Sequence, residues 1–286
     1  MDKKIKSIAD VVKADLERVN NHLVFDIELK KQLADELKKF LEAPSKRIRS
    51  LVTVLYLRAA KMYLLPAHYE LLAAVELVHN ASLVHDDVID ESKLRRNRQT
   101  LNDKFDNQLA VISGDYLLGI ALEKLVKISS MPVVEVFAKT IQNMCRGEVN
   151  QYFNKFQKTN LEAYIEKSTQ KTALLFETAL KSAVYLAEEE FDEKASEFAL
   201  NFGVAFQIRD DLLNIMKKDK SKTTTDVDDG IYNAPLILSD DINDGIAKTK
   251  DLLNNYVSCA KQCLEELENS PYKVALYELL ELIENV

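Results

Sequence analysis

Two clusters of acidic side chains are the residues of this sequence whose types and spacing could do chemistry. Asp86, Asp87 and Asp90 form the first cluster, and Asp210 and Asp211 form the second, far later in the chain. Within a helix, Asp86 and Asp90 lie one turn apart on the same face. Carboxylate oxygens at this spacing suit Mg²⁺, which commonly binds one or two carboxylates together with phosphate oxygens.

A single acidic cluster is more often a solvated helix end than a metal site. Here each cluster follows an apolar stretch at helical spacing, and buried carboxylates are costly unless cations compensate them. A di-iron site is the main alternative, since 76-ELVH-79 is one Glu-x-x-His motif, but no other histidine supplies the second motif that such a site needs. The pattern favours two facing Mg²⁺-binding patches that hold a diphosphate between them.

Basic side chains near these clusters supply further ligands for phosphate oxygens. Arg95 and Arg96 follow the first cluster, Lys171 lies in 168-STQKTALL-175, and 44-PSKRIR-49 precedes a predicted helix. Arginine forks match phosphate oxygens bidentately. Taken singly, each of these residues is typical of a surface charge, so their interpretation as ligands depends on the acidic clusters.

Helices are the elements that must position these side chains. The chain of 286 residues has only six Gly and five Pro, which are too few turn-forming residues for many short strands. Apolar residues at three- and four-residue spacing predict helices near 4–20, 27–42, 46–63, 67–93, 107–128, 132–155, 160–187, 191–218, 244–268 and 272–285. The sequence therefore predicts an all-α, single-domain helical bundle over residues 1–286.

Charge and composition exclude several classes of protein. The net charge of −8, with no basic block, argues against nucleic acid as a partner. The amino terminus lacks the apolar run of a signal peptide, and no segment has the roughly eighteen apolar residues of a transmembrane helix, so we expect a cytoplasmic chain. Cys145, Cys259 and Cys263 have no CxxC spacing, so neither a disulfide framework nor a zinc site is indicated.

Five stretches of the sequence resemble the motifs of the trans-isoprenyl diphosphate synthases, the polyprenyl synthetase family, and most of all its medium- and long-chain members. The stretches are 46-KRIR-49, 79-HNASLVHDDVIDESKLRRN-97, 171-KTALLFETA-179, 203-GVAFQIRDDLLN-214 and 229-DGIYNAPLI-237. They follow the order of the family and cover nearly the whole chain. The resemblance implies the isoprenoid synthase fold, a helical bundle around a deep central cavity, usually in a homodimer.

The resemblance also implies a reaction, in which an allylic diphosphate condenses with successive isopentenyl diphosphates to give an all-trans polyprenyl diphosphate. It implies about two or three Mg²⁺ ions, with metal ligands drawn from Asp86, Asp87, Asp90, Asp210 and Asp211. By the same resemblance, the allylic diphosphate is held by Arg95, Lys171, Thr172, Gln207 and Lys222, and isopentenyl diphosphate is held by Lys46, Arg49, His79 and Arg96. The catalytic residues among these are Asp86, Asp90, Lys171 and Asp210.

Product length in this family depends on the residues four and five positions before the first motif, where bulky aromatic side chains stop growth early. Here these residues are Ser82 and Ala81, and Val78 and Val75 further along the helix are also modest in size. The resemblance therefore predicts a product longer than C20, between about C30 and C45, that is delivered to a membrane. The charged segment 217–230 is predicted to be a mobile loop and a lid that excludes water.

Several positions depart from the family pattern. Asn214 replaces the last aspartate of the second motif, Ile231 and Asn233 replace a lysine and a threonine, and Pro44-Ser45 replaces a pair of glycines. These losses leave a second hypothesis open, in which the chain is a subunit or a weakened paralogue that acts only with a partner chain.

A class I terpene cyclase is a third hypothesis, because such enzymes share the fold and the first motif. Their second metal motif continues from its first residue with Ser or Thr and then Glu at four-residue steps. From Asp210 the corresponding residues here are Asn214 and Lys218, so that series is absent. The residues assigned to isopentenyl diphosphate would also have no role in a cyclase.

Overall fold

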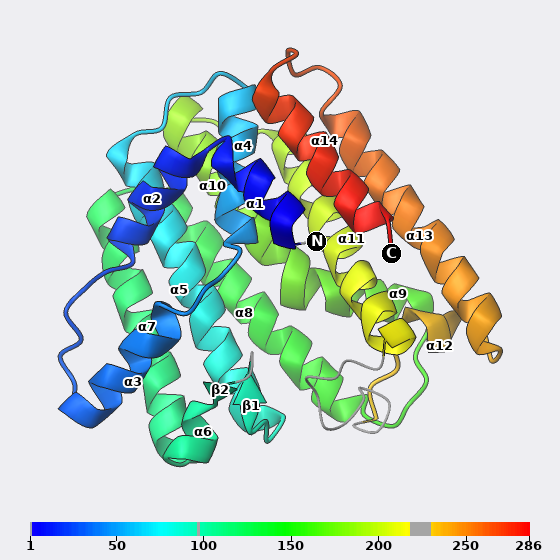
Figure 1. The fold of residues 1–286 in the computed structure, drawn as a ribbon, viewed down its shortest axis with the longest axis horizontal. Coiled ribbons are helices and arrows are strands. Elements are labelled where there is room, and N and C mark those ends of the chain that lie inside the picture. The colour runs from blue at the N-terminus through cyan, green and yellow to red at the C-terminus, as the bar shows by residue number, and fades with distance from the viewer. Residues whose placement is uncertain (1, 96–97, 218–229) are drawn as a thin grey trace.

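The structure is a computed structural model that describes residues 2–95, 98–217 and 230–286 (Figure 1). Within these ranges it is a bundle of helices, joined by one short antiparallel hairpin of β1 (Leu94–Arg95) and β2 (Arg98–Gln99). The prediction of an all-α fold is therefore confirmed. Among the described helices, none combines the length and the apolar character that crossing a bilayer requires.

The helices run in a simple order along the chain. They are α1 (Asp2–Asp10), α2 (Lys13–His22), α3 (Lys31–Leu41), α4 (Ile48–Ala59), α5 (Pro66–Ile89), α6 (Leu101–Lys104), α7 (Asn107–Ile128), α8 (Met131–Phe153), α9 (Leu161–Ser168), the π-helical segment η1 (Thr169–Ala173), α10 (Leu174–Glu188), α11 (Glu193–Lys217), α12 (Ala234–Leu238), α13 (Ile242–Cys263) and α14 (Pro271–Glu284).

Most helix boundaries lie within a few residues of the predicted ranges, and capping side chains hold several of the helix starts. Asp106 accepts a hydrogen bond from the backbone N–H of Leu109 at 2.7 Å at the start of α7, and Ser270 accepts one from Lys273 at 3.1 Å before α14. The structure corrects three expectations. The range 4–20 is two helices, the range 160–187 contains the π-helical segment, and the hairpin was not predicted.

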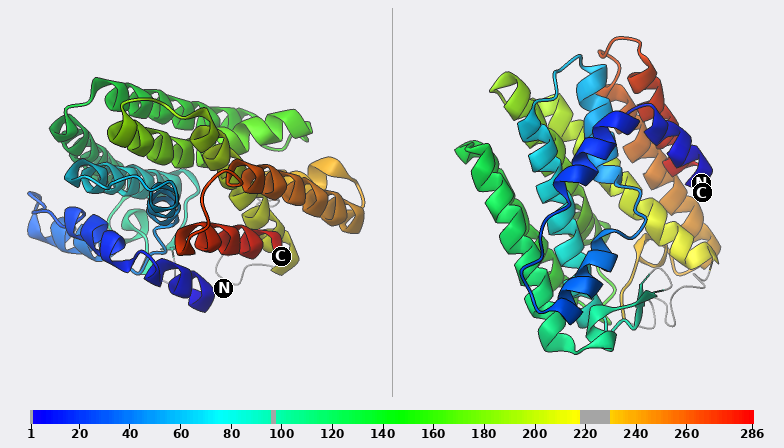
Figure 2. Two further views of the ribbon diagram at one scale, coloured as in Figure 1. Left: turned by 90° about the horizontal axis from the view of Figure 1, so that it is seen from above. Right: turned by 60° about the vertical axis from the view of Figure 1, so that its left-hand side comes forward.

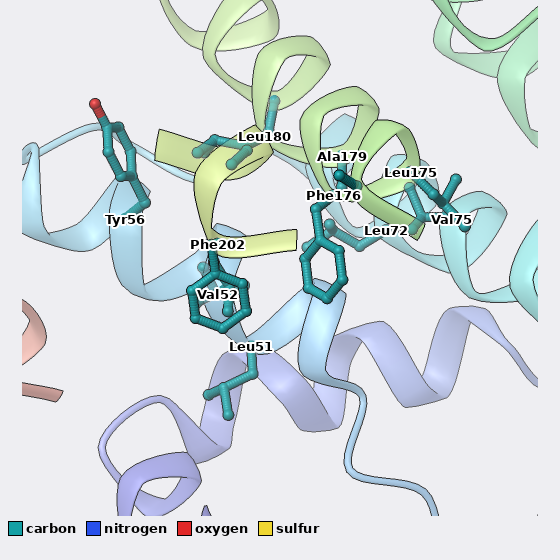
Figure 3. Packing of buried hydrophobic residues seen from close by; sticks show 14 of the residues in the cluster. Leu51, Val52, Tyr56, Leu72, Val75, Leu175, Phe176, Ala179, Leu180 and Phe202 are labelled. Carbon is teal, nitrogen blue, oxygen red and sulfur yellow. The ribbon is translucent and has the colours of Figure 1, made fainter. Parts of the chain in front are cut away.

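The core lies between α4, α5, α10 and α11, which pack side by side in the middle of the molecule (Figures 1 and 2). Figure 3 shows Phe176 of α10 and Phe202 of α11 among aliphatic side chains of α4 and α5. The centroids of these two rings lie 5.3 Å apart. Burying each such side chain contributes about 1.5–3 kcal/mol, so this layer fixes the relative positions of the helices that carry both acidic clusters.

Two glycines allow the neighbouring helices to approach η1 closely. A Cβ atom at Gly203 of α11 would lie 2.5 Å from Cα of Ala173, and a Cβ atom at Gly147 of α8 would lie 3.0 Å from Cβ of Gln170. Real Cβ atoms essentially never approach as closely as the contact at Gly203, so α11 needs glycine there. The contact at Gly147 is tight, and a Cβ atom there would require Gln170 to move by a few tenths of an ångström. The π-helical segment is thereby held between α8 and α11.

Candidate active site

A cavity of about 970 Å³ lies between α4, α5, α8, η1 and α11. Its walls bring together most of the predicted site residues, which come from segments far apart in the sequence. Those on its wall are Lys46, Arg49, His79, Ser82, Asp86, Asp90, Lys171, Thr172, Gln207, Asp210 and Asp211. The volume is at the upper end of the range for small-molecule sites, which is about 300–1,000 Å³.

The first acidic cluster divides between the cavity and the core. Asp86 lies in the last turn of α5 and Asp90 is the residue that caps its end, and both line the cavity. Asp87 is only 4% exposed and does not line this cavity. Its carboxylate accepts a hydrogen bond from Nε of Arg95 at 2.8 Å. This placement suits Asp87 as a support for its neighbours rather than as a metal ligand.

The second cluster presents two carboxylates with different partners. Asp210 of α11 lines the cavity and pairs with Nη1 of Arg209 at 2.9 Å. Asp211 is buried and accepts hydrogen bonds from the hydroxyl of Tyr164 at 2.7 Å and from Nε2 of Gln207 at 2.9 Å. Two fixed donors therefore orient Asp211 at the edge of the cavity.

Burial makes the ionised forms of these acids costly. It raises the pKa of Asp86 to about 7, with further repulsion from Glu148 and Asp90 and with attraction to Lys171 and Arg95 acting against the shift. Burial also raises the pKa of Asp210, and its neighbours Arg209, Lys46 and Arg49 oppose that change. Carboxylates that lack enough positive charge around them are groups that a bound cation stabilises.

Lys171 and Thr172 enter the cavity from η1. The Nζ atom of Lys171 lies 2.5 Å from a carboxylate oxygen of Glu148 and donates to Oε1 of Gln151 at 3.1 Å. The hydroxyl of Thr172 donates to Oε1 of Gln207 at 2.6 Å. Glu148 and Gln151 of α8 were not predicted as site residues. Their three-residue spacing placed them on one face of a predicted helix, but the sequence could not indicate that this face lines the cavity.

The basic end of the cavity is formed by the start of α4. The guanidinium of Arg49 lies 4.8 Å from the ring centroid of Phe176. Burial lowers the pKa of Arg49 to about 10, against the attraction of Glu76 and Asp210. Lys46 lies near enough to Asp210 to lower the pKa of that carboxyl. Positive charge from this segment therefore faces the second acidic cluster.

The remaining wall of the cavity is apolar. The contributing side chains come from α5, α7, α8, α10 and α11 and include Val78, Leu118, Ile141, Met144, Val149, Phe176 and Phe206. One cavity thus joins a strongly charged part to a part lined by hydrocarbon. This combination suits a molecule with an anionic head and an apolar tail.

Besides Asp87, two predicted site residues do not line the cavity, and others lie outside the described residues. Arg95 pairs with Asp87 and does not line the cavity. Ala81 is fully buried and does not line it either, in contrast to Ser82. Arg96, Lys222 and most of the predicted lid lie outside the described residues.

The residues present fit a hard cation shared with a phosphate group. Asp86, Asp90 and Asp210 offer carboxylate oxygens to one cavity. Among the described residues, no three His, Cys, Asp or Glu side chains converge to form a complete metal site. Mg²⁺ does not require one, because it usually keeps waters and takes some of its ligands from a bound phosphate.

Comparisons with known proteins agree with this geometry. A family model described as Polyprenyl synthetase matches residues 30–271. A prenyl transferase from Synechocystis is 32% identical over 277 residues, which cover 85% of this chain and 86% of that protein. Component 2 of the heptaprenyl diphosphate synthase from Geobacillus stearothermophilus is 34% identical over 215 residues, covering 74% and 67%. A solved decaprenyl diphosphate synthase from Rhodobacter capsulatus is 25% identical, with a TM-score of 0.85 over 98% of each chain.

Proposed function

Because the chain belongs to the polyprenyl synthetase family, we propose that it is a Mg²⁺-dependent polyprenyl diphosphate synthase. It condenses an allylic diphosphate with successive isopentenyl diphosphates and makes an all-trans product longer than C20. The observation that carries this proposal is that Asp86 and Asp90 from the end of α5 line the same cavity as Asp210 of α11, together with an apolar wall. The heptaprenyl and decaprenyl synthases to which the chain is similar support the product length.

The reaction needs charge stabilisation rather than a side-chain nucleophile. The allylic C–O bond breaks, and its electron pair leaves with the diphosphate. Lys171 and Thr172, which line the cavity from η1, would bind this diphosphate. Mg²⁺ bound by Asp86, Asp90 and Asp210 would neutralise the charge that develops on the leaving group.

The second substrate completes the chemistry at the basic end of the cavity. Lys46, Arg49 and His79 would hold isopentenyl diphosphate there. The double bond of this substrate attacks the allylic cation to form a C–C bond, and a proton then leaves to the departing diphosphate. Water would trap the cation, so the apolar wall serves both to exclude water and to hold the growing tail.

Several of the departures from the family pattern lie on the cavity wall and bear on how strongly the chain binds diphosphate. Ile231 and Asn233 both line the cavity, and neither offers the positive charge of a lysine. A second candidate function is therefore that of a subunit that acts only with a partner chain. The similarity to component 2 of a heptaprenyl diphosphate synthase supports this candidate.

A homodimer is the quaternary structure that we propose for the active chain. The support comes from α7, which carries large apolar side chains that are exposed in the single chain. Ile112 is 53% exposed, Leu122 is 48% exposed and Val126 is 68% exposed. An exposed apolar face of this kind is typical of a surface that packs against another protein.

Product analysis of the purified chain tests the proposed function. With farnesyl diphosphate, excess isopentenyl diphosphate and Mg²⁺, chromatography should show products longer than C20. Asp86→Asn should lower kcat by about a hundredfold or more, since a preorganised charge interaction is lost. The control is Asp251→Asn, because Asp251 is exposed on α13 and does not line the cavity.

Two results would contradict the proposal in different ways. Growth that ends at C15 or C20 would remove the long-chain assignment but keep the prenyltransferase. No release of diphosphate by the chain alone, restored by addition of a second protein, would favour the subunit.

A further inference from the structure

Glu76 is a buried carboxylate at the basic end of the cavity, where the proposed function assigns Lys46 and Arg49 to diphosphate binding. It lies in the middle of α5, is 2% exposed and belongs to the cavity wall near Lys46 and Arg49. A buried carboxylate is costly unless donors surround it. In a site for a diphosphate, the negative charge of Glu76 would also repel the substrate. The contacts of this carboxylate indicate a structural role for it.

The contacts of Glu76 show that it caps a neighbouring helix. Its Oε1 atom accepts hydrogen bonds from the hydroxyl of Ser50 at 2.7 Å and from the backbone N–H of Ser50 at 3.4 Å. Ser50 is the third residue of α4, and its backbone N–H is among those that a helix cannot satisfy internally. The residue at the N-cap position, Arg47, gives no side-chain cap. Glu76 supplies this cap from α5.

Arg47 has a backbone conformation that must be held in place. Its φ of 45° and ψ of 43° are left-handed, which costs a residue with a side chain about 1–2 kcal/mol. Three acceptors fix its guanidinium: Oδ1 of Asn20 at 3.3 Å, the carbonyl of Leu41 at 3.2 Å and Oε2 of Glu76 at 3.5 Å. Arg47 therefore turns the chain at a defined point just before α4.

The turn at Arg47 determines where the two flanking basic side chains lie. Lys46 precedes it and Arg49 follows it by two residues, and both line the cavity. The Nε atom of Arg49 is buried and has no hydrogen-bond partner among the described residues. A donor that is left unpaired inside the protein is available to an anionic ligand.

We propose that Glu76 is a positioning residue for isopentenyl diphosphate: by capping α4 and holding Arg47, it fixes Lys46 and Arg49 toward the cavity. This inference rests on the proposed function and assigns one of its substrates to one end of the site. Glu76 acts through Arg47 and Ser50 and does not itself contact the substrate. Its charge partly balances the basic cluster while the site is empty.

Binding and kinetics of two variants test this role. Glu76→Ala removes the cap and the charge, whereas Glu76→Gln retains an acceptor for Ser50 and removes only the charge. Glu70→Gln is the matched control, because Glu70 lies on the same helix and pairs with Lys124 at 2.9 Å without lining the cavity. Titration calorimetry with isopentenyl diphosphate in the absence of divalent cations measures the basic end alone.

We expect Glu76→Ala to weaken isopentenyl diphosphate binding by about tenfold or more, equivalent to about 1.4 kcal/mol. Its KM for isopentenyl diphosphate should rise by a similar factor, while the KM for the allylic substrate changes less than about twofold. Glu76→Gln should fall between Glu76→Ala and the wild type, and Glu70→Gln should match the wild type. Thermal unfolding of each variant shows that it is folded.

Equal changes in both KM values, or a lower melting temperature with unchanged binding, would overturn the assignment of Glu76. The proposed function has a separate readout. If the wild type binds isopentenyl diphosphate but forms no product, the proposed activity of the single chain fails. In that case the role of Glu76 is still decided by the binding titration, which compares the affinities of Glu76→Ala and the wild type for isopentenyl diphosphate.

Discussion

Ser82 and Ala81 are adjacent in α5 but have different surroundings. Ser82 lines the cavity, and its hydroxyl donates to the carbonyl of His79 at 2.9 Å. Ala81 is fully buried and packs in the core. A larger side chain at position 82 would therefore occupy the space of the growing tail, whereas one at position 81 would be forced into close-packed neighbours.

Ser82→Phe should shorten the product without abolishing turnover, because the ring would take up room next to Val78 and leave the acidic clusters in place. Chromatography of the products from farnesyl diphosphate measures this change. Ala81→Phe is the comparison. It should lower the free energy of unfolding by about 1–3 kcal/mol, since the core is overpacked. A stable Ala81→Phe variant with shortened products would mean that the cavity wall includes position 81.

His68 is a buried histidine whose neutral form the structure requires. Its Nδ1 atom accepts a hydrogen bond from the backbone N–H of Leu65 at 2.9 Å, and its Nε2 atom lies 2.9 Å from the carbonyl of Ala183. The neutral ring with its proton on Nε2 makes both bonds. Burial lowers the pKa of His68 below its ordinary value of 6.5.

Acid should therefore destabilise the fold through His68. Because the pKa is lower in the folded chain, the unfolded chain takes up the proton first as the pH falls. The stability that His68 contributes is present above its ordinary pKa of 6.5 and is lost as the pH falls through the folded pKa. We expect the free energy of unfolding to decrease on acidification less steeply in His68→Gln than in the wild type. Denaturant titrations at several pH values measure both slopes, and identical slopes would contradict the assignment.

The sequence predicted that Asp86, Asp90 and Asp210 come together, and in the structure they line one cavity. The side-chain partners of the acidic residues could not be predicted. Helical spacing alone placed Asp86 and Asp90 on one face. The orientation of Asp87 toward Arg95 and the pairing of Glu148 with Lys171 join different elements. Such contacts depend on how the elements pack, which a pattern within one helix does not determine.

The π-helical segment η1 carries Lys171 and Thr172 into the cavity. Substitution of Gly203, which packs against η1, tests whether the position of this segment matters for activity. Gly203→Ala should lower the free energy of unfolding by about 1–3 kcal/mol, because its Cβ would lie 2.5 Å from Cα of Ala173. Displacement of η1 should also move Lys171 and lower kcat. Denaturant unfolding and steady-state kinetics measure the two effects.

Gly119→Ala is the matched control for this substitution. A Cβ at Gly119, which lies inside α7, would meet nothing within 4 Å in the single chain. Measured in a monomeric background, where α7 makes no dimer contact, the higher helix propensity of alanine should therefore stabilise the chain by up to about 1 kcal/mol. If Gly203→Ala behaved in the same way, the close packing against η1 would have no energetic importance.

The long helices were predictable and η1 was not, for one physical reason. Apolar periodicity records which face of a segment is buried, and it placed α7 over 107–128 as the structure does. It does not record how many residues each backbone turn contains, so 160–187 was predicted as one regular helix. The glycines at 147 and 203 were visible in the sequence, but their effect depends on helices that meet only in the folded chain.

We expect two copies of the chain to form a homodimer through α7. Introducing charged side chains on the exposed apolar face of α7 tests this expectation. Ile112→Asp together with Val126→Asp should convert a dimer into a monomer, because each would place a charge in an apolar interface. Light scattering should give twice the chain mass of 32.6 kDa for the wild type and that mass for the variant. Val274→Asp, at a position 56% exposed on α14, should leave the dimer intact. A wild-type monomer would contradict the proposal.

The apolar wall of the cavity has a consequence for the speed of the whole catalytic cycle. Each isoprene unit adds five carbons, and burying them contributes about 4 kcal/mol at roughly 0.8 kcal/mol per carbon. The wall that retains a lengthening tail therefore also retains the finished product. We expect a rapid first round of synthesis followed by slow release, so that turnover is set by the detergent or lipid phase that accepts the product.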